Sequence, residues 1–171
     1  GVSGPIDRFA TLTGQQSQVG HVTVAWGQTT FAQLWPRLGS TPMLAVATGA
    51  FGSERVTPAA IASGKADAYL LAINAAAAQL GRPLYIRPLP EMNAWVNPYC
   101  AFNQDGSRRD AAHSPETFKK AFARIYLIVH GGRAAKIDAA LKTLGLPPVG
   151  RNLPAPAVTV IWNPQGRGSP E

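Results

Sequence analysis

Several residue types and segments are scarce or missing in this chain, and each absence limits its function. Cys100 is the only cysteine in 171 residues, so an internal disulfide and a cluster of metal-binding thiolates are both excluded. No apolar run reaches the length of about 20 residues that spans a membrane. The sequence also lacks a phosphate-binding glycine loop, a dinucleotide fingerprint and a nucleophilic serine elbow. These absences argue against a nucleotide-dependent enzyme and against a serine hydrolase.

Acidic residues are scarce as well. The chain has 9 of them against 16 Lys and Arg, which gives a net charge of +7 and a pI near 10.1. Such a charge would suit a nucleic-acid-binding protein. However, the cations are scattered, with Arg108-Arg109 and Lys119-Lys120 as the densest clusters, and no nucleic-acid-docking motif is present. We therefore expect neither a nucleic-acid nor a membrane partner.

The histidines and most of the acids give no sign of a metal or cofactor site. His21, His113 and His130 are too far apart in the sequence to form a metal site, and we expect no metal and no cofactor. Most acids are expected at structural or solvated positions. These are Asp67 and Glu116 at helix starts, Glu54 and Asp105 in loops, and Asp7, Asp110 and Asp138 on the surface.

The sequence does contain an alternation of apolar strands and helices. A parallel α/β arrangement in a single domain over residues 1–171 follows from this order. Trp35 falls on the first helix and is expected in the core. The expected strands are 19–26, 42–48, 83–87 and 157–162, and the expected helices are 30–38, 66–80, a helix between Ser114 and Gly131, and 134–144.

The most informative stretch follows the third expected strand, at residues 83–95. Two prolines end the strand, because proline cannot donate to a sheet ladder. Glu91, Asn93 and Trp95 come directly afterwards. In α/β barrels, the loops at the carboxyl ends of the strands carry the chemistry. An acid beside an amide and an indole is what a sugar-binding site needs.

Other residues are expected near this acid. Trp26, Thr48 and Trp162 also follow strands, so they should share one end of the sheet with Glu91 and line a cleft there. Tyr99 is a further aromatic candidate for stacking on a sugar. The segment from 88 to 114 that contains it is longer than a neutral connection, which favours a functional loop.

Two residues have open alternatives. Arg87 precedes Glu91 by four residues, and it would either bind substrate or form an ion pair that favours the ionised carboxylate. Asn93 would either bind a substrate hydroxyl or stabilise the turn after Pro90. The alternative for Glu91 itself is a role without function, as a solvated loop acid or as the ion-pair partner of Arg87.

A family resemblance rests on three segments, Asp67-Ala68-Tyr69-Leu70, Tyr85-Ile86-Arg87-Pro88 and Glu91-Met92-Asn93, with Trp95 and Trp162 beyond them. Together they resemble glycoside hydrolase family 26, which consists mostly of β-mannanases. The resemblance implies a (β/α)₈ TIM barrel and retaining hydrolysis of a β-linked polysaccharide such as mannan. It also implies that Glu91 is the general acid/base at the end of the fourth barrel strand, and that the protein is secreted.

The chain departs from the family pattern in two ways. Pro90 stands where the family usually has a histidine, and the family's nucleophile is a glutamate after the seventh strand. A complete barrel needs about 200–250 residues, so the 171 residues are expected to cover barrel strands two to five, about half. We therefore expect the nucleophile to lie outside this chain, and the remainder of the barrel or another partner to cover the open edges.

The resemblance leaves a second function open. A non-catalytic carbohydrate-binding or interaction module on a decayed barrel scaffold would also account for Pro90 and for the missing nucleophile.

Overall fold

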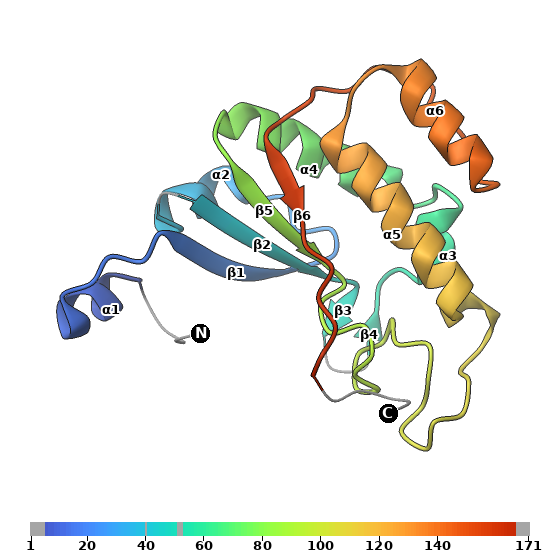
Figure 1. The fold of residues 1–171 in the computed structure, drawn as a ribbon, viewed down its shortest axis with the longest axis horizontal. Coiled ribbons are helices and arrows are strands. Elements are labelled where there is room, and N and C mark those ends of the chain that lie inside the picture. Colours follow the sequence, from blue (N-terminus) through green and yellow to red (C-terminus); the bar gives the residue numbers. More distant parts are fainter. Residues whose placement is uncertain (1–5, 40, 51–52, 167–171) are drawn as a thin grey trace.

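The main element of the fold is a parallel sheet with helices gathered on one side of it (Figure 1). A computed structural model describes residues 6–39, 41–50 and 53–166. The strands of the main sheet are β1 (Val19–Ala25), β2 (Thr41–Ala47), β5 (Leu84–Pro88) and β6 (Val158–Val160). A separate hairpin, β3 (Gly49–Ala50) with β4 (Ser53–Glu54), lies between β2 and the helices that follow.

The strand order supports the expected fold class. The order in the main sheet is β1-β2-β5-β6, which is the order in the chain, and each neighbouring pair is parallel. Consecutive strands of a (β/α)₈ barrel have this arrangement, with helices in the crossovers. The parallel α/β fold is thus confirmed, and its four strands correspond to half of a barrel's eight.

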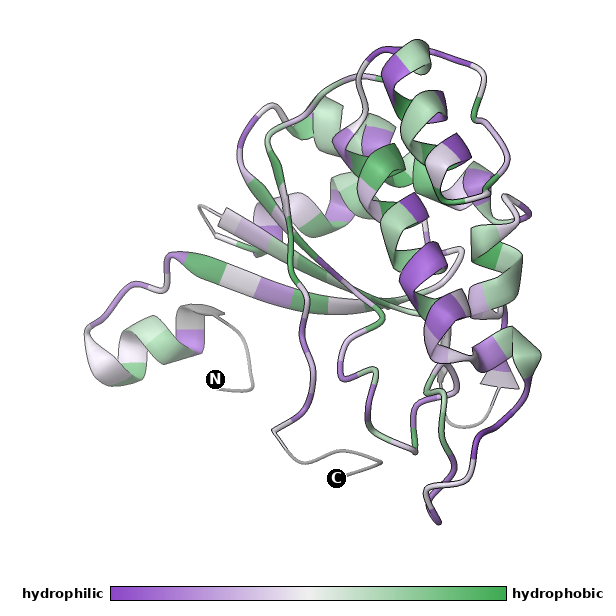
Figure 2. Cartoon of the chain, turned by 45° about the vertical axis from the view of Figure 1, so that its right-hand side comes forward, coloured by the Kyte–Doolittle hydropathy of each residue, from purple (hydrophilic) through white to green (hydrophobic). Residues whose placement is uncertain are grey.

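The helices supply the second layer. Those with bounds set by the structure are α1 (Ile6–Thr13), α2 (Phe31–Leu34), α3 (Pro58–Ala62), α4 (Asp67–Leu80), α5 (Pro115–His130) and α6 (Ala134–Thr143), with 3₁₀ turns η1 (Trp35–Arg37) and η2 (Ala111–His113). Helix α5 packs against α3, α4 and α6, whereas α1 stands apart from the sheet (Figure 1). Helix α5 carries both hydrophobic and hydrophilic residues (Figure 2), and its buried side chains include Phe118, Ile125 and Ile128.

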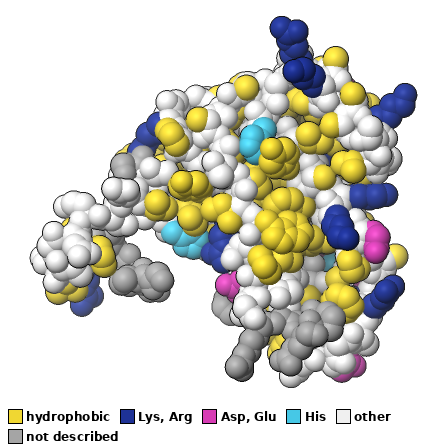
Figure 3. Space-filling view, viewed as in Figure 1, with side chains coloured by type: hydrophobic (Ala, Val, Ile, Leu, Met, Phe, Trp, Pro, Cys, Tyr) yellow, Lys and Arg dark blue, Asp and Glu magenta, His cyan; other side chains and the backbone are white. Residues whose placement is uncertain are grey.

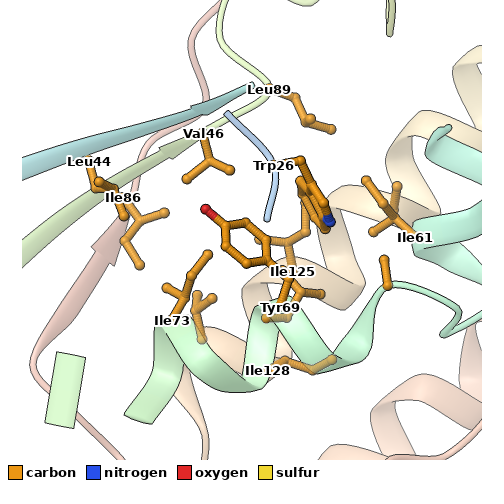
Figure 4. Close-up of a cluster of buried hydrophobic side chains, with 14 of the residues drawn as sticks. Trp26, Leu44, Val46, Ile61, Tyr69, Ile73, Ile86, Leu89, Ile125 and Ile128 are labelled. Atoms are coloured by element: carbon orange, nitrogen blue, oxygen red, sulfur yellow. The ribbon is translucent and has the colours of Figure 1, made fainter. Parts of the chain in front are cut away.

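The core lies between the sheet and the helices. Side chains alternate along a strand, and Leu44, Val46 and Ile86, each at most 1% exposed, all face the helical layer. They meet Tyr69 and Ile125 from α4 and α5 (Figure 4). Trp35, at 9% exposure, is in this core as expected.

The other face of the sheet carries no helix. The strand register places His21, Met43, Tyr85 and Thr159 in one row across all four strands, on the face opposite the core residues. His21 and Thr159 are exposed, and Met43 and Tyr85 are partly exposed. This is the face that lines the interior of a complete barrel.

Two buried polar side chains tie the helices together. The Arg124 guanidinium, 1% exposed, forms a two-pronged pair with Asp67 at the start of α4, and its Nη1 donates to the Pro147 carbonyl at 2.7 Å. Asn74 Nδ2 donates to the carbonyls of Val129 and Pro154 at 3.1 and 3.0 Å. Asp67 therefore anchors α5 in addition to starting α4.

The structure differs from the expected elements at several points. Residues 30–38 split into α2 and η1, because Pro36 interrupts the helix. Strand β6 is shorter than expected, with prolines 154 and 156 before it and Pro164 after it. Helices α1 and α3 and the β3–β4 hairpin were not expected from the sequence pattern. Among the described helices, none is both long enough and apolar enough to span a bilayer.

Candidate functional site

The candidate site begins where β5 ends, at a backbone turn that few side chains adopt. Leu89 and Glu91 have φ angles of 48° and 56°, in the left-handed region that costs a non-glycine residue about 1–3 kcal/mol. The Leu89 amide donates to the Val46 carbonyl at 2.8 Å, and the Glu91 amide donates to the Asn163 carbonyl at 2.8 Å. The turn is therefore clamped between the ends of β2 and β6.

The Glu91 side chain is partly open to solvent and faces a cation. Its side chain is 44% exposed, and Oε1 lies 3.4 Å from Arg87 Nη2. Arg87 Nε also donates to Asn163 Oδ1. Of the two alternatives for Arg87, the structure shows the ion pair. A pair this exposed contributes about 0–1 kcal/mol, so a ligand could replace either partner at little cost.

The carbonyls of Pro90 and Glu91 are held by two side chains from the following loop. Asn97 Nδ2 donates to the Glu91 carbonyl at 2.8 Å and to the Pro90 carbonyl at 3.3 Å. The Tyr99 hydroxyl donates to the Pro90 carbonyl at 2.6 Å. Tyr99 is 2% exposed, and burial raises the pKa of its hydroxyl above the usual 10.0. Tyr99 therefore positions the acid's backbone, and its ring has no face open to a sugar.

Arg109 also holds the loop that follows Glu91. Its guanidinium donates to the carbonyls of Trp95, Asn97 and Pro98. Three backbone acceptors on one side chain fix the path of the residues after Glu91. Sequence reasoning missed this role, and that of Asn97, because neither residue belongs to a recognisable motif.

Asn93 uses its amide within the protein. Its Nδ2 donates to the Gln165 carbonyl at 3.1 Å, and its Oδ1 accepts from the Gln165 amide at 2.6 Å. This reciprocal pair joins the segment after Glu91 to the segment after β6. Asn93 thus fixes the C-terminal side of the site, a role that neither of the two alternatives for it anticipated.

The three tryptophans named from the sequence as site candidates have different environments. Trp26 is 7% exposed, and its ring packs 4.9 Å from Tyr69 in the core (Figure 4). Trp95 is 43% exposed and Trp162 is 51% exposed. The structure therefore leaves two indoles available to a ligand beside the Glu91 turn and places the third inside the core.

Trp162 forms one wall of a small apolar pocket. Its ring meets Phe118 and Phe122 of α5 edge-on, with centroids 5.7 and 4.7 Å apart. The pocket has a volume of about 150 Å³ and is lined by Met92, Asn93, Ala101, Phe102, Pro115, Phe118, Lys119 and Trp162. Met92 follows Glu91 directly, so the pocket starts one residue from the acid. Apolar side chains gather over β6 and α5 on the face shown in Figure 3, with Lys and Arg side chains beside them.

A second ionisable cluster links the hairpin to the end of the long loop. His113 Nε2 lies 2.8 Å from Glu54 Oε2, and His113 Nδ1 lies 2.7 Å from Asp110 Oδ1. Glu54 Oε1 also accepts from the Thr48 hydroxyl at 3.3 Å. Glu54, expected as a loop acid, is thus largely buried and paired, whereas Asp110, 63% exposed, is a surface acid as expected and also contacts His113. The sequence could not show this pairing, because Glu54 and His113 are 59 residues apart.

The charge state of His113 follows from these contacts. Burial alone would lower the pKa of His113, but its hydrogen bonds to the two carboxylates, together with their charges, raise the pKa above 6.5. The same contact lowers the pKa of Asp110. The two carboxylates on either side of the imidazole therefore favour its protonated form. Within the described part of the chain, no group of three or more His, Cys, Asp or Glu side chains could hold a metal ion.

No protein-family model matches the chain, and no curated protein matches it. Among solved structures, the chain is similar to mannanase man26 of Bacillus subtilis, with 20% sequence identity and a TM-score of 0.49. The match covers 94% of this chain and 51% of the mannanase, so the chain spans about half the length of that protein.

Proposed function

We propose that this chain is the acid/base half of a retaining endo-glycosidase of the family 26 type, which hydrolyses a β-linked polysaccharide such as mannan. Glu91 is the general acid/base. The observation that carries the proposal is the clamped left-handed turn that sets a partly exposed carboxylate at the carboxyl end of β5. Strained backbone of this kind concentrates at functional sites.

The proposed chemistry needs two carboxyl groups. A retaining glycosidase uses a nucleophile about 5–5.5 Å from the acid, which first protonates the leaving oxygen and later activates water. When two carboxyls share a site, one of them keeps its proton. In the free chain Glu91 instead faces Arg87. We propose that the second carboxylate completes the site and shifts this balance.

The nucleophile is proposed to come from outside this chain. Most acids among the described side chains already have other partners: Glu54 and Asp110 bind His113, Asp67 binds Arg124, Asp105 binds Ser107, and Asp138 binds the amides of Val149 and Gly150. In the described part of the chain, none of them is hydrogen-bonded to the Glu91 turn.

The proposed partner is the remainder of the barrel. Both β1 and β6 are edge strands of the main sheet, and open strand edges tend to pair with other chains. Tyr126 on α5 and Trp162 after β6 are 46% and 51% exposed, on the side where the next strand and helix of a barrel would pack. Since polymeric mannans lie outside cells, the proposal includes a secreted protein.

A second function is favoured by one observation. The Glu91 carboxylate is paired with Arg87 and has no carboxylate partner among the described residues. A non-catalytic carbohydrate-binding module on the same scaffold would not need a second carboxylate. Such a module would bind the glycan through Trp95 and Trp162 without cleaving it.

An assay for the release of reducing sugar from β-mannan by the full-length protein distinguishes the enzyme from the binding module. We expect the Glu91→Gln variant to lose about 10²–10⁴-fold in rate, the usual contribution of a general acid or base. Glu116→Gln is the matched control, because Glu116 is exposed in the first turn of α5. Hydrolysis unchanged in Glu91→Gln would refute the acid/base role. Binding of mannan by a wild-type protein that does not hydrolyse it would favour the module.

A further inference from the structure

The pocket beside Glu91 combines aromatic walls with an available cation. Phe102, Phe118 and Trp162 give it apolar surfaces, and Lys119 of α5 lies on its lining. Its volume of about 150 Å³ has room for several water molecules, which suits part of a single sugar ring. The pocket therefore has room for part of one sugar unit, and its lining begins at Met92, the residue after the proposed acid.

A second cation, Arg108, belongs to the loop that supplies Phe102 to the pocket. The backbone of Arg108 forms a β-bridge with that of Phe102, one of the lining residues. Both Lys119 and Arg108 are exposed, and neither side chain bonds to another residue in the described part of the chain. Glu116 precedes Lys119 by one helical turn but does not form an ion pair with it.

The acids of the chain do little to balance these cations. Most of the described carboxylates bind groups inside the protein, as the partners of His113 and Arg124 do. The chain carries a net charge of +7. A neutral sugar would leave the Lys119 ammonium without an anionic partner, whereas an acidic sugar would supply one.

We propose that this pocket binds a sugar that carries a carboxylate, so that the β-linked glycan recognised by the chain contains acidic units beside neutral ones. The faces of Trp162 and Phe102 would contact the apolar side of the ring. The Lys119 ammonium would donate a charge-assisted hydrogen bond to the sugar carboxylate. This inference rests on the proposed function, because it names the substrate class of the same site.

The test compares two ligands that differ only at C6. Oligosaccharides of β-1,4-linked mannuronate and of β-1,4-linked mannose, equal in length, are titrated into the full-length protein carrying Glu91→Gln, which slows hydrolysis during the titration, and binding is followed by calorimetry. We expect mannuronate to bind about three- to tenfold more tightly, the range of one partly exposed charge-assisted bond. The preference should shrink at high salt, because exposed charges are screened.

Two lysines give a matched pair of variants. Lys119 and Lys120 are both exposed on α5, but only Lys119 is among the residues that line the pocket. We expect Lys119→Gln to remove the preference for mannuronate and Lys120→Gln to keep it. Trp162→Phe should weaken both ligands by a similar factor, since it reduces the aromatic wall without changing the charge.

Several outcomes would overturn the inference. Equal affinity for the two oligosaccharides would leave the proposed function standing and refute the anionic substrate. An equal effect of Lys119→Gln and Lys120→Gln, or equally tight binding of a single-stranded DNA oligonucleotide of the same charge, would show an unspecific response to net charge. Binding of neither oligosaccharide would count against the inference and the proposed function together.

Discussion

The His113 cluster leads to a prediction about stability and pH. The imidazole is 12% exposed, and both of its nitrogens meet carboxylates, Glu54 at 2.8 Å and Asp110 at 2.7 Å. His113→Gln removes the charge from this position. The hydrogen bond to the largely buried Glu54 alone contributes about 1.5–3 kcal/mol when one partner is charged. For a chain of this size, that corresponds to a fall in Tm of about 3–12 °C.

The pH dependence has a definite sign. The folded protein raises the pKa of His113 above 6.5, so this stabilisation is fully present below pH 6.5 and is lost as the pH rises through the folded value. The pKa of Asp110 is lowered from 3.8, so its share is present above pH 3.8 and is lost as the pH falls. The cluster should therefore stabilise the protein most between these two values.

The pH dependence can be measured by thermal unfolding of the wild type and of His113→Gln between pH 5 and 9, followed by circular dichroism. We expect the difference in Tm to be largest near pH 5–6 and to shrink toward pH 9. His130→Gln is the control, because His130 contacts a carbonyl of its own helix and no carboxylate. A difference that is constant with pH, or that grows as the pH rises, would refute the raised pKa of His113.

Three further predictions concern stability and are measured by chemical denaturation. Gly131→Ala should lower the free energy of unfolding by about 2–4 kcal/mol, since an added methyl would lie 1.7 Å from the Pro154 carbonyl oxygen. Gly145→Ala, at a similar φ but with nothing within 4 Å of the added methyl, should lower it by only about 1–2 kcal/mol. Equal losses for the two variants would contradict the steric explanation. Arg124→Met should cost about 3–5 kcal/mol because it leaves Asp67 without its partner, and adding Asp67→Asn should recover part of this loss. His21→Gln should raise stability relative to the wild type below pH 6.5, since burial and Arg87 lower the pKa of His21 and protonation therefore favours unfolding; no change on acidification would contradict it.

The sequence predicted the sheet more completely than the site. Apolar runs at 42–48 and 83–87 are found as β2 and β5, and the helix opened by Ser114 is found as α5 with Ser114 as its N-cap. These features depend on residues close together in the chain. Local signals of this kind are strong wherever periodicity and caps agree.

The support of the site could not be predicted, because it depends on distant contacts. The Glu91 amide is held by a carbonyl 72 residues later, and Asn93 pairs with Gln165 over the same separation. The left-handed φ of Glu91 has no signal in its residue type, since glycine and asparagine are the usual residues there. Trp26 at a strand end looked available to a ligand, but Tyr69 of α4 packs against it in the core.

The central claim is that Glu91 is the acid/base of a retaining site, and azide rescue tests it most directly. The full-length Glu91→Ala variant is given an aryl β-mannoside whose leaving group needs no protonation. We expect slow turnover that azide accelerates, with a β-mannosyl azide of retained configuration as the product, because a small anion can enter the space of the missing carboxylate and needs no general base. An α-mannosyl azide would make Glu91 the nucleophile instead, and turnover that azide does not change would contradict a role for Glu91 in the chemistry.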